Sequence, residues 1–183
     1  MPGGRIAILS FLFLLLCPKP AHTWRPAPKR IPPITIWQVK NAEYQLAFDG
    51  RKYKLINGKY VSGKIGQGNY ISIIVDIASL GDMDGDANAD AAVLLAVTGG
   101  GTGTFHELAI ILNKGGKPVY AGTKRGLGDR NIVESLAIAG GTAVIGLKVP
   151  GPGDALCCPT KKVKWKFRLK WDKRLKYHVV QVR

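Results

Sequence analysis

Cysteine is scarce in this sequence, and its spacing argues against a thiolate metal centre. The chain of 183 residues has three cysteines, of which Cys157 and Cys158 are adjacent. No CxxC spacing occurs, although such a spacing is what makes a cysteine metal site convincing. We therefore rank a vicinal disulfide between Cys157 and Cys158 first. Two free buried thiols come second, and a soft metal ion held together with His106 or His178 comes third.

Sequence signatures of enzymes are equally sparse. The glycine-rich segment Thr98 to Phe105 lacks the GK[ST] of a phosphate-binding loop and joins two expected strands. No GxSxG elbow is present, and His106 with Glu107 lies in a strand-like run instead of a helical HExxH. Asp129 and Asp154 stand in glycine-flanked turns, where Asp commonly accepts backbone donors. An enzyme is therefore not expected, unless distant residues assemble an active site.

Windows long enough for a helix are also few. The 23 glycines and 11 prolines interrupt the chain within the ten or more residues that a helix needs. Short apolar runs flanked by glycine are typical of buried strands instead. We expect such strands at Tyr70 to Ala78, Ala91 to Val97, Glu107 to Leu112, Ile132 to Ile138 and Thr142 to Val149.

Two hairpin dipeptides support the same fold class. Asp49-Gly50 separates Tyr44 to Phe48 from Lys52 to Ile56, and Asn57-Gly58 precedes Tyr60-Val61. The sequence thus predicts a single, mainly β domain built from antiparallel strands, either a sandwich or an open barrel.

The N-terminal residues resemble an export signal. Arg5 precedes an apolar run from Ile6 to Leu16, which is too short for a transmembrane helix of about twenty residues. A basic flank, a short apolar region and small residues before Trp24 are typical of a cleaved signal peptide. We expect a signal peptide over residues 1–23 and a periplasmic or secreted protein.

Two further expectations concern the mature N-terminus. Lipidation at Cys17 is the alternative to cleavage near Thr23, but Leu16 is not the small residue that a lipobox requires. Residues 24–33 are rich in proline, which lacks a backbone donor, so we expect an extended tether. The β domain is then expected to cover residues 34–183.

Acidic residues are outnumbered, with 27 Lys and Arg against 12 Asp and Glu and a formal net charge of +15. The C-terminal segment alternates apolar and basic residues, which places them on opposite faces of a strand. Its apolar set is Val163, Trp165, Phe167, Leu169 and Trp171, and its basic set is Lys164, Lys166, Arg168 and Lys170. Leu175 to Val182 is its expected hairpin partner.

The basic face has two interpretations. It could make weak contact with an anionic envelope surface, because clustered cations attract polyanions. Alternatively, the lysines only protect an exposed strand from edge-to-edge aggregation, and we favour this solvated strand. Specific binding of nucleic acid is not expected, because the aromatic side chains lie on the face opposite the cations.

The segment GDMDGDANADAAVLL concentrates acidic residues in one short loop. Its oxygen-bearing side chains occupy the first, third, fifth, seventh and ninth positions, at Asp82, Asp84, Asp86, Asn88 and Asp90. Calcium takes six to eight oxygen ligands, and alternate residues of a tight loop point theirs inward. We therefore propose these five residues as metal ligands, with calcium as the ion. The alternative is an ordinary Asp/Gly/Asn turn between two strands.

This loop resembles the calcium loop of integrin-α-type propeller repeats. It does not resemble an EF-hand, because Val93 occupies the twelfth position, where a bidentate Glu is required. It departs from the pattern at Ala87, where glycine is usual, and it occurs once.

Three ordered segments give a second resemblance: the acidic loop with its following strand, GLGDR, and GPGDALCCPT. Together they resemble a group of exported bacterial proteins of unknown function that share DxNGDGxxDAAVLL, GDR and GPGDxxCCPT segments. The resemblance covers Leu80 to Thr160 and implies a secreted or periplasmic β domain, with no known activity or substrate.

Two functions therefore remain. The first is a non-catalytic cell-envelope protein whose acidic loop binds calcium. The second is a metal-dependent hydrolase of the cell envelope that uses the same acidic cluster. A cleft beside the loop with a second acid or a histidine in reach would favour the hydrolase.

Overall fold

A computed structural model describes residues 30–124, 126–155, 157–174 and 176–183 of the chain. The predicted signal peptide at residues 1–23 and most of the predicted tether at residues 24–33 lie outside the described residues. Within the described ranges, no helix is both long and apolar enough to span a membrane.

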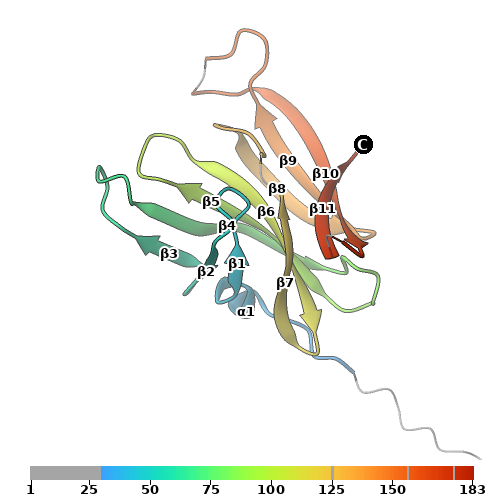
Figure 1. The fold of residues 1–183 in the computed structure, drawn as a ribbon. Coiled ribbons are helices and arrows are strands. Elements are labelled where there is room, and N and C mark those ends of the chain that lie inside the picture. Colours follow the sequence, from blue (N-terminus) through green and yellow to red (C-terminus); the bar gives the residue numbers. More distant parts are fainter. Residues whose placement is uncertain (1–29, 125, 156, 175) are drawn as a thin grey trace, which may run out of the picture. The chain divides into compact units, whose positions relative to one another are not determined.

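Strands form nearly all of the regular structure in the described chain (Figure 1). The elements in chain order are α1 (Ile36–Lys40), β1 (Glu43–Gln45), β2 (Lys52–Lys54), β3 (Lys59–Ser62), β4 (Ile71–Gly81), β5 (Asp90–Thr98), β6 (Phe105–Lys114), β7 (Lys117–Lys124), β8 (Ile132–Ala139), β9 (Thr142–Val149), β10 (Lys161–Asp172) and β11 (Lys176–Val182).

The strands form a pair and two larger sheets, and every pairing is antiparallel. The larger sheets have the orders β3-β4-β5-β6-β7 and β11-β10-β9-β8, while β1 pairs only with β2. In these orders sequence neighbours are also spatial neighbours, as short hairpin connections require. The predicted fold class, a mainly β domain of antiparallel strands, is confirmed.

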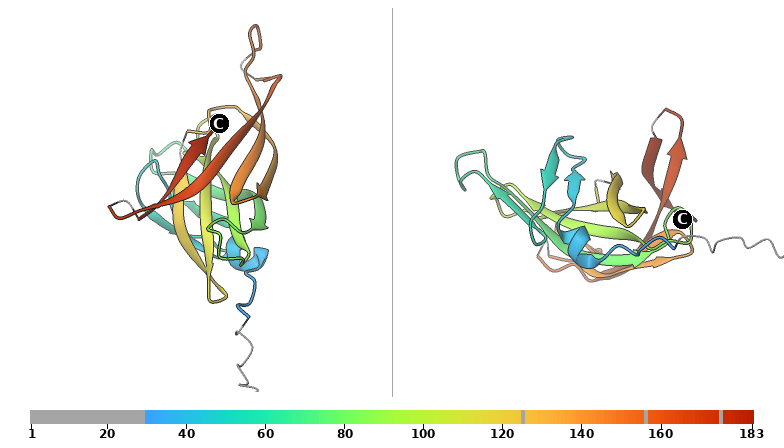
Figure 2. Two further views of the ribbon diagram at one scale, coloured as in Figure 1. Left: turned by 90° about the vertical axis from the view of Figure 1, so that its right-hand side faces the viewer. Right: turned by 90° about the horizontal axis from the view of Figure 1, so that it is seen from below.

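The five-stranded sheet is the middle layer, because its central strand is buried on both faces. Ala91, Val93 and Leu95 of β5 pack into one core together with residues of α1, β1 and β2. Ala92 and Leu94 of the same strand pack into a second core, with residues of β9 and β10. Figure 2 shows β1, β2 and α1 beside one face of this sheet in its right-hand view. A strand buried on both faces has no polar alternation, which explains the continuous apolar run at β5.

A helix of one turn, α1, was not expected from the sequence. Its N-terminus is closed by a capping box: the hydroxyl of Thr35 accepts a hydrogen bond from the Gln38 N–H, and the Gln38 side chain accepts one from the Thr35 N–H. The T-x-x-Q spacing is the recognised signal for such a start. At five residues, α1 is shorter than the ten or more residues for which the sequence was expected to offer few windows, so the glycine and proline spacing did not exclude it.

The basic strand β10 alternates as predicted, and each of its two halves pairs with a different neighbouring strand. Phe167 is buried on the apolar face, while Lys166 and Arg168 are exposed on the other. β10 pairs with β9 over Lys161 to Arg168 and with β11 over Lys166 to Asp172, so the described sheet covers both of its sides only from Lys166 to Arg168. Lys164 lies where β10 has no partner on the β11 side, and Lys170 lies where it has none on the β9 side. Protection of an exposed strand edge by these cations therefore stays a prediction.

The antiparallel order gives the five-stranded sheet two chemically different ends. At one end lie the β4–β5 loop and the β6–β7 turn, since Gly81 pairs with Asp90 and Lys114 pairs with Lys117. At the other end β4 and β6 begin and β5 and β7 finish. The acidic loop lies at the first end, and a cavity of about 650 Å³ lies at the second.

Candidate metal-binding loop

The acidic loop leaves β4 at Gly81 and enters β5 at Asp90. A Cβ atom on Gly81 would lie 2.8 Å from side-chain carbons of Ile138 in β8, so a larger residue would push the two sheets apart here. Within the loop, Gly85 has φ 86° and Ala87 has φ 63°. Glycine is usual at the position of Ala87 in the loop that this segment resembles, and the backbone of Ala87 adopts a positive φ despite its Cβ atom.

Four of the five predicted ligands converge. Asp82, Asp84, Asp86 and Asp90 each place a carboxylate oxygen within 4.8 Å of the others. Such a group of carboxylates could hold a metal ion. The fifth residue, Asn88, uses its backbone and side-chain N–H groups to bond Asp86, with donor–acceptor distances of 2.9 Å and 3.2 Å.

The loop carboxylates also bind the loop's own backbone. Asp82 accepts hydrogen bonds from the N–H groups of Gly85 at 2.7 Å and Ala87 at 3.0 Å. The N–H of Asn88 lowers the pKa of Asp86, and the charge of Lys114 lowers it further. These bonds are those of an ordinary Asp turn as well. The shape of the loop is therefore compatible with a metal site and with an ordinary Asp turn. Metal binding is supported by the convergence of the carboxylates, not by these hydrogen bonds.

Asp90 fixes the position of the loop through its buried carboxylate. It is fully buried, and its two oxygens accept hydrogen bonds from the N–H groups of Met83 and Asn113, each at 2.8 Å. Burial raises its pKa, and the nearby charges of Asp84 and Asp86 raise it further, whereas the two backbone donors oppose this. A bound cation would offset these effects, because it favours the ionised carboxylate.

Lys114 belongs to the candidate site, although the sequence did not point to it. Its Nζ lies 2.7 Å from Asp84 Oδ2 and 3.6 Å from Asp86 Oδ2, and the hydrogen bond to Asp84 raises the lysine pKa. Lys114 is the last residue of β6, whose end lies beside the loop because β5 and β6 are antiparallel neighbours. Strand order, which is not visible in the sequence, was needed to find it.

A shallow cleft of about 310 Å³ lies beside the loop. Its described lining comprises Met83, Asp84, Gly85, Asp86, Leu169, Trp171 and Tyr177. Trp171 is 61 % exposed although it continues the apolar face of β10. Apart from the loop's own aspartates, this described lining holds no acid and no histidine.

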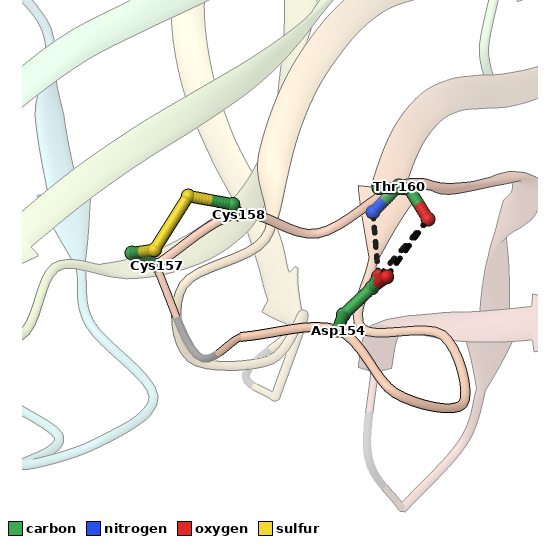
Figure 3. The surroundings of a disulfide bond; sticks show 4 residues. All are labelled: Asp154, Cys157, Cys158 and Thr160. Atoms are coloured by element: carbon green, nitrogen blue, oxygen red, sulfur yellow. Dashed lines mark hydrogen bonds between the residues drawn. A yellow bond between two sulfur atoms is a disulfide. The ribbon is translucent and has the colours of Figure 1, made fainter.

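The two cysteines lie on the exposed β9–β10 connection, far along the chain from the acidic loop. The structure joins Cys157 and Cys158 through their sulfur atoms, and both residues are exposed (Figure 3). Asp154 closes the same loop by accepting hydrogen bonds from the N–H groups of Gly151 and Thr160, each at 2.7 Å, which lower its pKa. This is the backbone-accepting role expected for Asp154.

The alternative metal ligands do not gather with the cysteines. His106 pairs instead with Asp76, with Nε2 3.2 Å from Oδ2. Among the described residues, the four aspartates of the loop are the one group of three or more acidic, His or Cys side chains close enough to share an ion.

Comparison of the chain with protein-family models, with curated proteins and with solved structures finds no match.

Proposed function

We propose that the protein is a non-catalytic β-domain protein of the cell envelope whose acidic loop binds a calcium ion. The observation that carries this proposal is the convergence of Asp82, Asp84, Asp86 and Asp90 within 4.8 Å. Carboxylate oxygens are hard ligands that suit calcium, and an exposed loop of this kind has the weak affinity of extracellular modules, with a Kd of about 10⁻⁴ to 10⁻³ M.

The charge of the loop supports a bound cation. Four carboxylates close together repel one another unless a positive charge offsets them. Lys114 supplies a single positive charge to this cluster, and it reaches only Asp84 and Asp86. A divalent ion would supply the positive charge that the other carboxylates lack. It would also favour the ionised form of Asp90, whose pKa is raised.

The second candidate, a metal-dependent hydrolase, has less support. A hydrolytic metal site needs an open coordination position together with a general acid or base near the ion. The cleft beside the loop is lined by Leu169, Trp171 and Tyr177, and apart from the loop's own aspartates its described lining offers no second acid and no histidine. We therefore place the hydrolase second.

Thermal unfolding with calcium tests the proposal. With a Kd near 1 mM, calcium at 10 mM stabilises the folded state by about 1.4 kcal/mol and raises Tm. Asp84→Asn combined with Asp86→Asn abolishes this rise, because it removes two of the converging carboxylates. Glu43→Gln is the matched control, since Glu43 pairs with Lys52 in the β1–β2 hairpin. An equal rise in the double variant would contradict a site in the loop.

Location in the envelope needs a separate test. The motivating observation is the basic and apolar leader at Arg5 and Ile6 to Leu16. The intact mass of the protein recovered from an exporting bacterial host should match a chain that starts near Trp24. A mass that retains residues 1–16 contradicts export by cleavage, and an added diacylglyceryl mass supports lipidation at Cys17.

A further inference from the structure

A second and larger cavity, of about 650 Å³, lies at the end of the five-stranded sheet opposite the acidic loop. Its volume falls within the range of about 300 to 1,000 Å³ that is usual for small-molecule sites. Its walls come from five separate segments: the turn between β1 and β2, the residues before β4, the end of β5, the start of β6 and the residues after β7. A concave site assembled from several loops at one end of a rigid sheet is a common position for ligand binding.

Aromatic side chains form much of the wall. They are Phe48, Tyr53, Tyr70 and Phe105. Phe105 is 53 % exposed and Phe48 is 41 % exposed, so neither ring is needed to fill a core. Exposed aromatic rings that gather around a concavity mark a binding surface more often than isolated exposed rings do.

The charge of the cavity is opposite to that of the chain. Its described lining contains three acidic residues, Asp49, Glu107 and Asp129, and two basic ones, Arg51 and His106. Glu107 is buried and accepts hydrogen bonds from the N–H groups of Ala47 and Phe48. Asp49 and Asp129 are exposed, and Asp129 pairs with Arg130, whose Nε lies 3.6 Å from Asp129 Oδ2. The acidic residues thus still outnumber the arginines at the site.

Two of the glycine-rich segments meet at this cavity. A backbone bridge joins Phe105, at the end of the Thr98 to Phe105 segment, to Asp129 of the GLGDR segment. Gly128 has φ 91°, and a Cβ atom there would collide with the Asn131 side chain. Gly128 therefore allows the backbone course that places Asp129 next to Phe105. Neither segment has a role in the acidic loop.

We propose that this cavity binds a small organic cation, with an ammonium group carried on an apolar or aromatic stem. The rings of Phe48, Tyr70 and Phe105 contact the stem and attract the cation through their negative faces. Asp49 and Asp129 provide the opposite charge. The site is independent of calcium and of the loop at the other end of the sheet.

Three probes that share one phenethyl group test the charge preference of the full-length protein. They are phenethylamine, which is cationic, 2-phenylethanol, which is neutral, and 3-phenylpropionate, which is anionic. Binding is measured by protein-observed NMR titration at low ionic strength. We expect phenethylamine to bind at least about tenfold more tightly than 2-phenylethanol and to shift resonances of Phe105 and Asp129, and we expect 3-phenylpropionate to bind most weakly.

Variants then assign the contacts. Asp129→Asn and Asp49→Asn should each weaken phenethylamine binding about threefold to tenfold and leave 2-phenylethanol unchanged. Phe105→Leu should weaken both probes. Glu134→Gln is the control carboxylate, because Glu134 pairs with Lys148 outside the cavity. Asp49 accepts a hydrogen bond from the Tyr53 hydroxyl at 2.5 Å, whereas Asp129 has a longer, partly exposed ion pair with Arg130 at 3.6 Å. Asp129→Asn is therefore the variant with the smaller effect on the local structure.

The outcomes separate clearly. Equal affinity for the amine and the alcohol would show that the cavity selects only apolar groups and would overturn the proposal. Tighter binding of 3-phenylpropionate would overturn it as well and would assign the dominant charge to the arginines at the site, Arg51 and Arg130. An absence of binding by all three probes at 10 mM, roughly the weakest affinity that a useful site of this size shows, would also overturn it. Loss of amine binding in Asp129→Asn but not in Glu134→Gln supports it.

Discussion

The ammonium group of Lys114 lies 2.7 Å from Asp84 Oδ2 and therefore places a fixed positive charge inside the acidic cluster. The lysine side chain is 43 % exposed, whereas that of Asp84 is 10 % exposed. The two groups come from different hairpins, β6–β7 and β4–β5. Their pairing ties the loop to the neighbouring turn, and it also sets Lys114 in competition with any cation that the loop binds.

Replacing Lys114 tests this competition. We expect Lys114→Met to tighten calcium binding about threefold to tenfold, because a like charge beside the ion is removed. Without calcium the variant should lose at most about 1 kcal/mol of stability, since the ion pair is partly exposed. Calorimetric titration with calcium and thermal unfolding in its absence measure the two effects.

The control for Lys114 is Lys52→Met. Lys52 pairs with Glu43 at 3.1 Å, so this variant removes an exposed ion pair of the same kind on another hairpin. Its calcium affinity should equal that of the parent protein. Weaker calcium binding in Lys114→Met would contradict competition and would mean that the lysine positions the loop for the ion.

The raised pKa of Asp90 makes the calcium effect depend on pH. Without calcium, the folded protein holds the Asp90 proton more tightly than the unfolded chain does. Protonated Asp90 therefore stabilises the folded state below the unfolded pKa of about 3.8. This stabilisation is lost as pH rises through the higher folded pKa. Calcium requires the ionised carboxylate, so the stabilisation by calcium should grow as pH rises through the same window.

Unfolding free energies measured with and without 10 mM calcium between pH 3.5 and 7 check this dependence. The difference should be near zero at the acidic end and should reach its plateau above the folded pKa of Asp90. Asp86 does not contribute to this window, because its pKa is lowered and it therefore titrates below 3.8. A calcium effect that is constant with pH would show that Asp90 is not coupled to the ion.

Features that depend on local pattern could be predicted from the sequence. The run Thr142 to Val149 is found as β9 without change, and Asn57-Gly58 forms a two-residue turn with both φ angles positive. Such features follow from side-chain periodicity and from the φ angles that Asn and Gly allow. The alternation in β10 likewise predicted which face is solvated.

Features that depend on strand order could not be predicted. β7 was missed because Pro118 interrupts its pattern, although its position at the edge of the sheet tolerates a proline. The pairing of Lys114 with Asp84 and the meeting of Phe105 with Asp129 join residues 30 and 24 positions apart. Both require the antiparallel neighbours to be known, and periodicity alone does not give them.

The vicinal disulfide is predicted to have little effect on global stability. Cys157 and Cys158 are adjacent, so their bond closes almost no loop, and the chain-entropy model gives only about 1 kcal/mol for so short a ring. Both residues are exposed, so reduction opens no cavity in either core. Tm should fall only slightly in reductant.

Thiol titration of the denatured protein, recovered from an oxidising compartment, checks the bond itself. Fewer than one free thiol per chain is expected from Cys157 and Cys158 before reduction, and two are expected after it. Two free thiols before reduction would contradict the bond. A covalent dimer that separates only in reductant would instead show pairing between chains.

The solvent-facing cations of β10 provide the last prediction. Replacing Lys164, Lys166, Arg168 and Lys170 by glutamine should leave the fold intact, because all four side chains are exposed and β10 keeps its pairing to β9 and β11. A small loss of stability is expected from Arg168, whose Nε donates a hydrogen bond to Thr142 Oγ1 at 2.9 Å. Far-UV circular dichroism checks the fold, and thermal unfolding measures the loss of stability.

The same variant decides whether this face contacts anionic surfaces. For weak electrostatic contact, retention of the parent protein on vesicles that contain anionic phospholipid should vanish near physiological salt, where the Debye length is about 8 Å. The matched control replaces Lys52, Lys54, Lys59 and Lys64, which are also exposed, by glutamine and removes the same charge from another part of the surface. If both variants lose retention equally, net charge alone explains it. If only the β10 variant loses it, the cations must act as a cluster, because they project from one face of a single strand at the two-residue spacing that the sequence displays.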